Sequence, residues 1–185
     1  MKKIIPVSFP WMVSPSTPML RLIVDENGDC LVRFVGFFLN ESKQNADSIN
    51  VVDAYDGLTI DPEDKCGSYQ LISLSFLDAG WSRRSPQHSD RQVVDESLFD
   101  WSQIEGQIKA GEDAVSWQAR FRSKWNETGV CPDSSVYIVE DSEWAKEVGS
   151  GRYEMKHYLI LGESSYVEVL AKDFRWVSEG SLVGW

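Results

Sequence analysis

Histidine is the side chain most often used as a general base near neutral pH, and this chain of 185 residues contains two, His88 and His157. His88 lies next to Ser89 and Asp90, which together are the residue types of a nucleophilic triad. A triad needs these groups oriented by the fold, however, and adjacency in sequence does not supply that. We therefore interpret the stretch around His88 as a polar loop. His157 lies inside the apolar run Tyr153–Leu161, which predicts a partly buried strand histidine.

A cluster of basic residues gives the chain one candidate site for an anionic molecule. Arg83, Arg84 and Arg91 lie close together in sequence, and His88 falls between them. If the segment borders a cleft between a sheet and helices, these four side chains would gather an anionic substrate or ligand. This is the alternative, enzyme-like hypothesis for the chain.

Other chemistry is not indicated by any motif. The sequence has no CxxC or HExxH pair for a metal, and no GxGxxG or GxxxxGK[ST] loop for a phosphate. Its three cysteines are widely spread and odd in number, which does not suggest a disulfide framework. We therefore predict no metal, no cofactor and no catalytic residue, so that the chain is not expected to be an enzyme.

Acidic residues form the second candidate site. The net charge is −11, and most of it lies in the second half of the chain. Four acids gather at and just beyond the end of a predicted strand, where they would form one carboxylate surface with an aromatic anchor nearby. Such a surface would attract a basic protein partner, and tryptophan, of which the chain has eight, is enriched at the energetic centres of protein interfaces. The predicted partner-binding residues are Glu140, Asp141, Glu143, Glu147, Trp144 and Tyr137.

The charge balance and the hydropathy pattern also exclude some functions. An isoelectric point near 4.6 argues against binding nucleic acid or an anionic membrane, because such binding depends on clustered Lys and Arg. No apolar run approaches the ~20 residues that span a bilayer. The basic start of the chain resembles a signal peptide, but Pro6 and Pro10 interrupt its apolar stretch. We therefore expect a cytoplasmic protein.

Alternating apolar and polar residues predict most of the strands. Asn27-Gly28 lies between two apolar runs, which is a strong signal for a β-hairpin. The last segment, through Trp176, is expected to be a strand end or a docking tail. The predicted strands are Met19–Asp25, Cys30–Leu39, Ile49–Tyr55, Tyr69–Leu77, Val136–Glu140, Tyr153–Leu161 and Tyr166–Ala171.

Helical spacing predicts two central helices over residues 95–126. Ser97 and Asp100 have the form of a capping box, and Trp101, Ile104 and Ile108 follow at helical spacing. A second helix is expected at about Glu112–Asn126, and a short third one at Asp141–Val148 with Trp144 turned inward. The helical face of the second contains Ala114, Trp117, Phe121 and Trp125.

The order of these elements predicts a single α+β domain over residues 1–185. It is strand-rich at 19–77, helical at 95–126 and strand-rich again at 136–177, which favours a mainly antiparallel sheet with the two central helices packed on it.

In size, charge and composition the chain is similar to the immunity proteins that bacteria pair with toxins. The resemblance implies a dedicated inhibitor that neutralises a basic cognate toxin through the acidic, aromatic surface around Glu140–Glu147. Two alternatives remain: a small-ligand-binding protein or enzyme using the Arg83–Arg91 segment, and an accessory subunit of a larger assembly.

Overall fold

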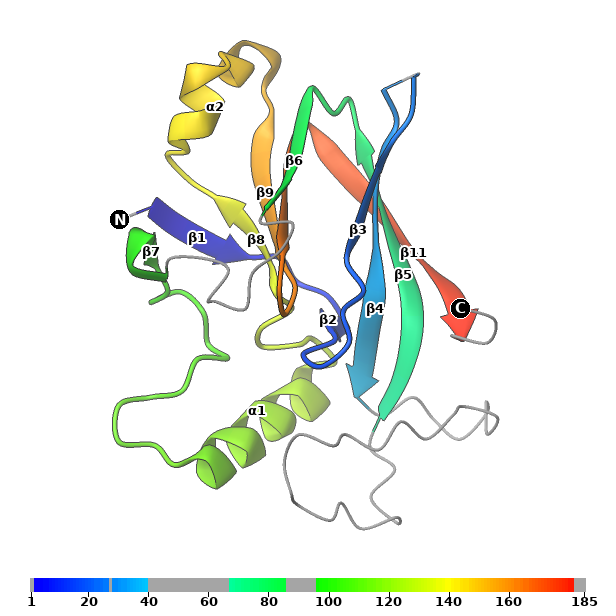
Figure 1. Cartoon of the computed structure of the whole chain (residues 1–185). Helices are drawn as coiled ribbons and strands as arrows, with labels where there is room; N and C mark the ends of the chain where they lie inside the picture. The colour runs from blue at the N-terminus through cyan, green and yellow to red at the C-terminus, as the bar shows by residue number, and fades with distance from the viewer. Residues whose placement is uncertain (1, 27, 40–66, 86–95, 182–185) are drawn as a thin grey trace.

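Two β-sheets face each other across one apolar core in the computed structural model, which describes residues 2–26, 28–39, 67–85 and 96–181 (Figure 1). Among the described strands, neighbours run antiparallel except for one short parallel pair, β1 with β7. The first sheet has six strands in the order β6-β10-β9-β8-β1-β7. They are β1 (Lys2–Pro6), β6 (Trp81–Ser85), β7 (Phe99–Asp100), β8 (Val136–Val139), β9 (Lys156–Leu161) and β10 (Tyr166–Ala171).

The second sheet has five strands in the order β11-β5-β4-β2, with β3 also paired to β4. The β3–β4 pair is the hairpin that the Asn-Gly turn predicts. The prediction of a sheet-rich α+β fold with mainly antiparallel pairing is confirmed, although the strands divide between two sheets. The strands of this second sheet are β2 (Trp11–Val13), β3 (Arg21–Val24), β4 (Cys30–Leu39), β5 (Gly67–Leu77) and β11 (Asp173–Ser181).

Strand alternation gives the six-stranded sheet two buried faces. On β9, Tyr158 and Ile160 belong to the core between the sheets, together with Phe34 and Ile72 of the other sheet. Leu159 points the opposite way, into a separate cluster on the outer face. Because both faces are covered at the centre of the sheet, β8, β9 and β10 are mostly apolar.

A segment predicted as a helix covers part of that outer face without being helical. Ile104 is buried there against Ile4, Tyr137, Val139 and Leu159. The chain forms only a short 3₁₀ helix, η1 (Glu96–Leu98), then β7, then a series of turns up to the next helix. The expected helix at 97–108 is therefore wrong.

Two side chains of the following helix explain why turns replace the expected helix. Trp117 donates its indole N–H to the carbonyl of Gly106 at 2.7 Å. Arg120 donates to the carbonyls of Glu105 and Gln107 at 2.9 and 2.8 Å. The carbonyls that would accept hydrogen bonds within a helix are thus bound from outside, and Gly106 itself disfavours a helix interior.

The second predicted helix is α1 (Ala114–Thr128), and its ends follow capping rules. The side chain of Asp113 accepts hydrogen bonds from the amides of Val115 and Ser116, and Gly129 ends the helix in the left-handed region with φ 68°. Phe121 and Trp125 pack against Phe37 and neighbouring apolar side chains of β2 and β4. α1 therefore covers one end of the five-stranded sheet and is not central to a sheet face (Figure 1).

Two further segments of the chain form strands. Trp81–Ser85, expected to be a polar loop, forms the edge strand β6 paired with β10. β11 extends the second sheet, so the described part of the last segment is a strand. Ile49–Tyr55 lies outside the described residues. None of the helices in the described part of the chain has the length and apolar character needed to cross a bilayer.

The non-helical path of residues 101–111 can be tested by replacing Gly106. A helix there would gain about 1 kcal/mol of stability from Gly106→Ala. In this fold the new Cβ would lie 2.5 Å from the Cβ of Asp133 and 2.9 Å from a ring carbon of Phe121, so we expect a loss of about 1–3 kcal/mol. Urea unfolding followed by circular dichroism measures the difference, with Gln103→Ala as the control in the same segment. A more stable Gly106→Ala protein would contradict the described path.

Candidate functional site

The acidic segment predicted from the sequence follows β8 and leads into the short helix α2 (Glu143–Glu147). Asp141 takes a positive φ of 54° at this turn, and Ser142 is the N-cap residue of α2. The Ser142 hydroxyl oxygen accepts a hydrogen bond from the Ala145 amide at 3.1 Å. α2 has only five residues and none of them is buried. A helix this short is not stable alone, so contacts with the rest of the protein must hold it in place.

The main anchor of α2 is a chain of polar side chains on the outer face of the six-stranded sheet. His157 of β9 is 5% exposed, and its Nδ1 lies 2.7 Å from the Ser142 hydroxyl oxygen. Its Nε2 lies 3.1 Å from a carboxylate oxygen of Glu168 on β10, a residue that is 6% exposed. Three elements are thus connected through side chains that the sheet holds in fixed register.

Arg83 of β6 completes this chain of contacts. Its Nη2 donates to Glu168 at 2.9 Å, and its Nε donates to the other carboxylate oxygen, which makes the pair bidentate. The two residues are also register partners of β6 and β10. We call Ser142, His157, Glu168 and Arg83 the polar network.

Electrostatics keep Glu168 ionised in this position. Burial by itself raises the pKa of the carboxyl, but the His157 imidazole and the Arg83 guanidinium outweigh burial and lower the pKa to about 2. The same pairing raises the pKa of Arg83, mainly through its hydrogen bond to Glu168. A buried carboxylate with these partners is stable as an anion across the neutral range.

Trp144 joins the network to α2 by its ring. The Arg83 guanidinium lies over this ring, 4.2 Å from its centroid, which is a cation–π contact. The His157 ring meets Trp144 edge to face at 5.2 Å between centroids. Residues from both sequence-predicted sites, Arg83 and Trp144, are therefore in direct contact.

The predicted partner-binding acids lie on the surface around α2, and we call Glu140, Asp141, Glu143 and Glu147 the acidic edge. The side chains of Asp141 and Glu143 are 90% and 76% exposed. Glu147 is also exposed, and Glu140 is half-buried. Lysines approach three of them: Lys3 lies 2.9 Å from Glu140, Lys2 lies 3.7 Å from Glu143 and Lys146 lies 3.9 Å from Asp141.

Tyr137 is not part of that surface. It is 2% exposed, packs edge to face against Trp101 and donates its hydroxyl to Asp133 at 2.6 Å. Burial raises the pKa of Tyr137 well above its usual value. Its ring belongs to the outer-face cluster, so Trp144 is the aromatic residue beside the acidic edge.

The alternative cluster of basic residues is only partly described. Arg83 is bound to Glu168, and Arg84 donates to the Ser165 hydroxyl at 3.2 Å. His88 and Arg91 lie outside the described residues. Within the described part of the chain, no group of three or more His, Cys, Asp or Glu side chains is arranged to hold a metal ion.

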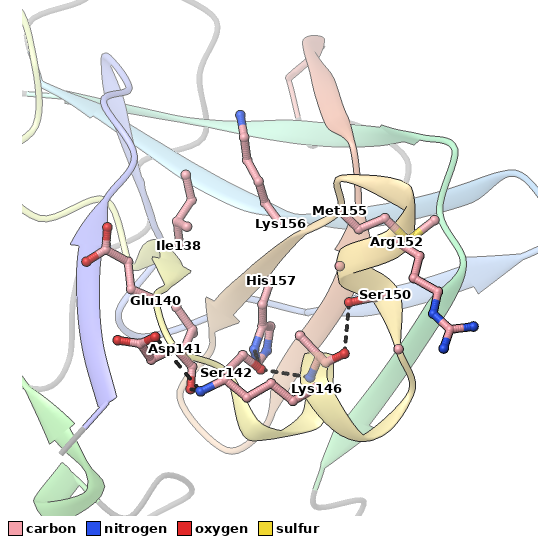
Figure 2. Close-up of a pocket in the computed structure, with 14 residues that line it drawn as sticks. Ile138, Glu140, Asp141, Ser142, Lys146, Ser150, Arg152, Met155, Lys156 and His157 are labelled. Carbon is pink, nitrogen blue, oxygen red and sulfur yellow. Dashed lines mark hydrogen bonds and ion pairs between the residues drawn. The ribbon is translucent and has the colours of Figure 1, made fainter.

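A pocket of about 490 Å³ opens beside α2 (Figure 2). Ser142 and His157 of the polar network line it, and a dashed line marks the hydrogen bond between them. Ile138, Ala145 and Met155 supply an apolar part of the wall. Charged side chains of both signs also line it: Glu140, Asp141, Lys146, Arg152 and Lys156.

Comparison of the chain with protein-family models, curated proteins and solved structures gives no match.

Sequence reasoning placed His157 correctly in a buried strand but did not connect it to Ser142 and Glu168. A usable signal was present, because Glu168 interrupts the otherwise apolar strand β10. A carboxylate in such a strand is rarely buried without a cationic partner. That rule would have pointed to Arg83 and His157 as candidates.

The contribution of the polar network to the stability of the fold can be measured by replacing Glu168. We expect Glu168→Gln to lower the free energy of unfolding by about 1–3 kcal/mol, because it leaves buried donors without a charged acceptor. Glu163→Gln, at an exposed position, is the control. Urea unfolding at neutral pH measures both, and equal midpoints for the two variants would contradict the assignment.

The same carboxyl predicts a pH dependence. Its pKa is lower in the folded protein, about 2, than the ordinary value of 4.5, so its contribution to stability is full above pH 4.5 and is lost as the pH falls toward 2. Unfolding between pH 6 and pH 3 should therefore show a steeper loss of stability for the wild type than for Glu168→Gln. Parallel curves would show that Glu168 is not held as an anion.

Proposed function

We propose that this chain is a protein inhibitor of the immunity-protein kind, which neutralises a basic toxin in the bacterial cytoplasm by binding it through the acidic edge. One observation carries the proposal: exposed carboxylates lie on a segment that the polar network holds in place. Asp141, Glu143 and Glu147 project from α2 and the turn before it. Beneath them, Ser142 and Trp144 are held by His157 and Arg83.

The spacing of the acids suits recognition of a basic surface. Glu143 and Glu147 are four residues apart on α2, so they share one side of the helix. Within 140–147 four carboxylates stand against one lysine, Lys146. Such a field raises the rate at which a positively charged partner meets this part of the molecule.

The lysines that pair with the acidic edge do not prevent this use. The pairs of Glu143 with Lys2 and of Asp141 with Lys146 span 3.7 and 3.9 Å, and in each the carboxylate side chain is largely exposed. Exposed ion pairs of this kind contribute little stability, because water and salt screen them. A partner with Arg or Lys in the right positions can replace these lysines at small cost.

The fixed position of α2 supports affinity as well as rate. Binding is weakened when an interface must be ordered at the moment of contact, so a preformed surface binds more tightly. The network fixes Ser142 at the start of α2 and Trp144 within it. By contrast, the alternative anion site has less support, because the Arg83 guanidinium already binds Glu168.

The first experiment is a pull-down with the tagged chain from a lysate of its own organism that expresses the target. It uses the wild type, a neutral variant Glu140→Gln/Asp141→Asn/Glu143→Gln/Glu147→Gln, and a control Glu26→Gln/Glu127→Gln/Glu163→Gln/Asp173→Asn. The control removes the same number of exposed acids away from α2. We expect wild type and control to hold one basic protein that salt elutes, and the neutral variant to lose it.

Equal capture by the neutral variant would exclude the acidic edge as the interface. Capture of a large assembly would favour the accessory-subunit alternative. A captured basic protein must also be toxic when expressed alone and harmless when expressed with this chain. Failure of that co-expression test would overturn the inhibitor proposal.

Association kinetics test the electrostatic part directly. With the captured partner in stopped-flow mixing at low salt, we expect the neutral variant to associate at least about tenfold more slowly than the wild type. Its rate should also depend less on salt, because steering by exposed charges is what salt screens. The control variant should keep the salt dependence of the wild type, and a matching loss in the control would assign the effect to net charge alone.

A further inference from the structure

Ser142, His157 and Glu168 have the arrangement of a nucleophile, a base and an orienting carboxylate. The Ser142 hydroxyl oxygen lies 2.7 Å from Nδ1 of His157, and Nε2 of the same ring lies 3.1 Å from Oε1 of Glu168. The three residues come from the start of α2, from β9 and from β10. Such a constellation is recognised by geometry and roles on any fold, not by sequence order.

The charge on Glu168 favours one tautomer of His157, although Nε2 approaches the carboxylate without hydrogen-bond geometry. An ionised carboxylate oxygen 3.1 Å from Nε2 favours the tautomer with its hydrogen on that nitrogen. In the neutral imidazole, Nδ1 is then unprotonated and accepts the hydrogen bond from the Ser142 hydroxyl. This is the tautomer that a general base needs to take the proton of a serine.

Ser142 lies in the wall of a pocket. Although the residue is only 6% exposed, it and His157 both line the pocket of about 490 Å³ beside α2 (Figure 2). Ile138 and Met155 give that pocket an apolar surface. Lys146 and Arg152 line it as well, so the wall also carries positive charge.

We propose that Ser142 is an activated nucleophile and that the pocket beside it accepts the acyl group of a small, mainly apolar ester. Ser142 is the catalytic nucleophile and His157 its base, while Glu168 is a positioning residue. This activity is separate from the inhibitor function proposed above and uses the pocket, not the exposed carboxylates of the acidic edge.

The proposed reaction balances without any cofactor. The Ser142 oxygen bonds to the ester carbonyl carbon as its proton passes to Nδ1 of His157, and the bond to the leaving alkoxide then breaks. His157 gives the proton to that alkoxide, which leaves as the alcohol. Water attacks the acyl-serine with His157 again as base, so that the carboxylic acid departs and the Ser142 hydroxyl is restored.

A second serine in the same pocket provides an internal comparison. Ser150 lines the pocket too, but its hydroxyl donates to the Ala145 carbonyl at 3.2 Å, and that contact supplies no base. Ser150 is also 0% exposed, so it is shielded from reagents in solution. Activation by His157 predicts reaction at Ser142 only.

The experiment is covalent labelling of the full chain with an alkyl fluorophosphonate, followed by intact-mass and peptide mass spectrometry. In this reaction the Ser142 oxygen bonds to phosphorus, fluoride leaves, and His157 takes the serine proton. We expect one label, on Ser142, in the wild type and in the control Ser165→Ala, whose serine is buried outside the pocket. His157→Gln should slow labelling about 100-fold or more, the usual contribution of a general base.

Ser142→Asp separates chemistry from folding. Aspartate is a good N-cap, so this variant keeps the capping contact of α2 but has no nucleophile. We expect it to keep the circular dichroism spectrum of the folded wild type and to take no label. Release of p-nitrophenol from p-nitrophenyl butyrate should likewise be present in the wild type and absent in Ser142→Asp.

An unlabelled wild type, a label on another serine, or equal rates in wild type and folded His157→Gln would each overturn the proposal. The contacts of Ser142 would then serve only to anchor α2. These outcomes do not depend on a protein partner, so they leave the inhibitor proposal unaffected.

Discussion

The buried carboxylate of Glu168 is the constraint on which this side of the molecule depends. β10 is apolar on both sides of it, and an unpaired charge in that position would be strongly destabilising. Arg83 must therefore reach it from β6, and His157 must face it from β9. Once the imidazole is fixed, its other nitrogen determines where Ser142 lies, and Ser142 determines where α2 begins.

This dependence explains why one short helix can serve two proposed roles. The exposed side of α2 presents Glu143 and Glu147, whereas its start holds Ser142 against the imidazole and the pocket. A protein partner would meet the first, and a small molecule would enter the second. Both need α2 in one position, and α2 has no buried residue of its own to provide that.

Much of the fold could be predicted, because alternation along a strand directly reflects burial. Cys30–Leu39 and Tyr166–Ala171 coincide with β4 and β10 at both ends. The prediction of a helix at 97–108 was wrong. Trp101 and Ile104 have helical spacing, but a series of turns lying on a sheet can place both side chains against that sheet equally well. β6 was missed since an edge strand with Arg83 and Arg84 is polar enough to resemble a loop.

The candidate site was harder to predict, because its residues become neighbours only through strand register. Arg83 and Trp144 were each singled out, but for different functions, and their contact arises from the pairing of β6 with β10 and the placement of α2. Nothing in the sequence brings Ser142 to His157 without that pairing. Apolar side chains of similar volume would hold α2 against the sheet without fixing its position. Hydrogen bonds and a bidentate ion pair, by contrast, form in one geometry. We infer that the network is polar because the segment it holds has to be positioned, and not merely covered.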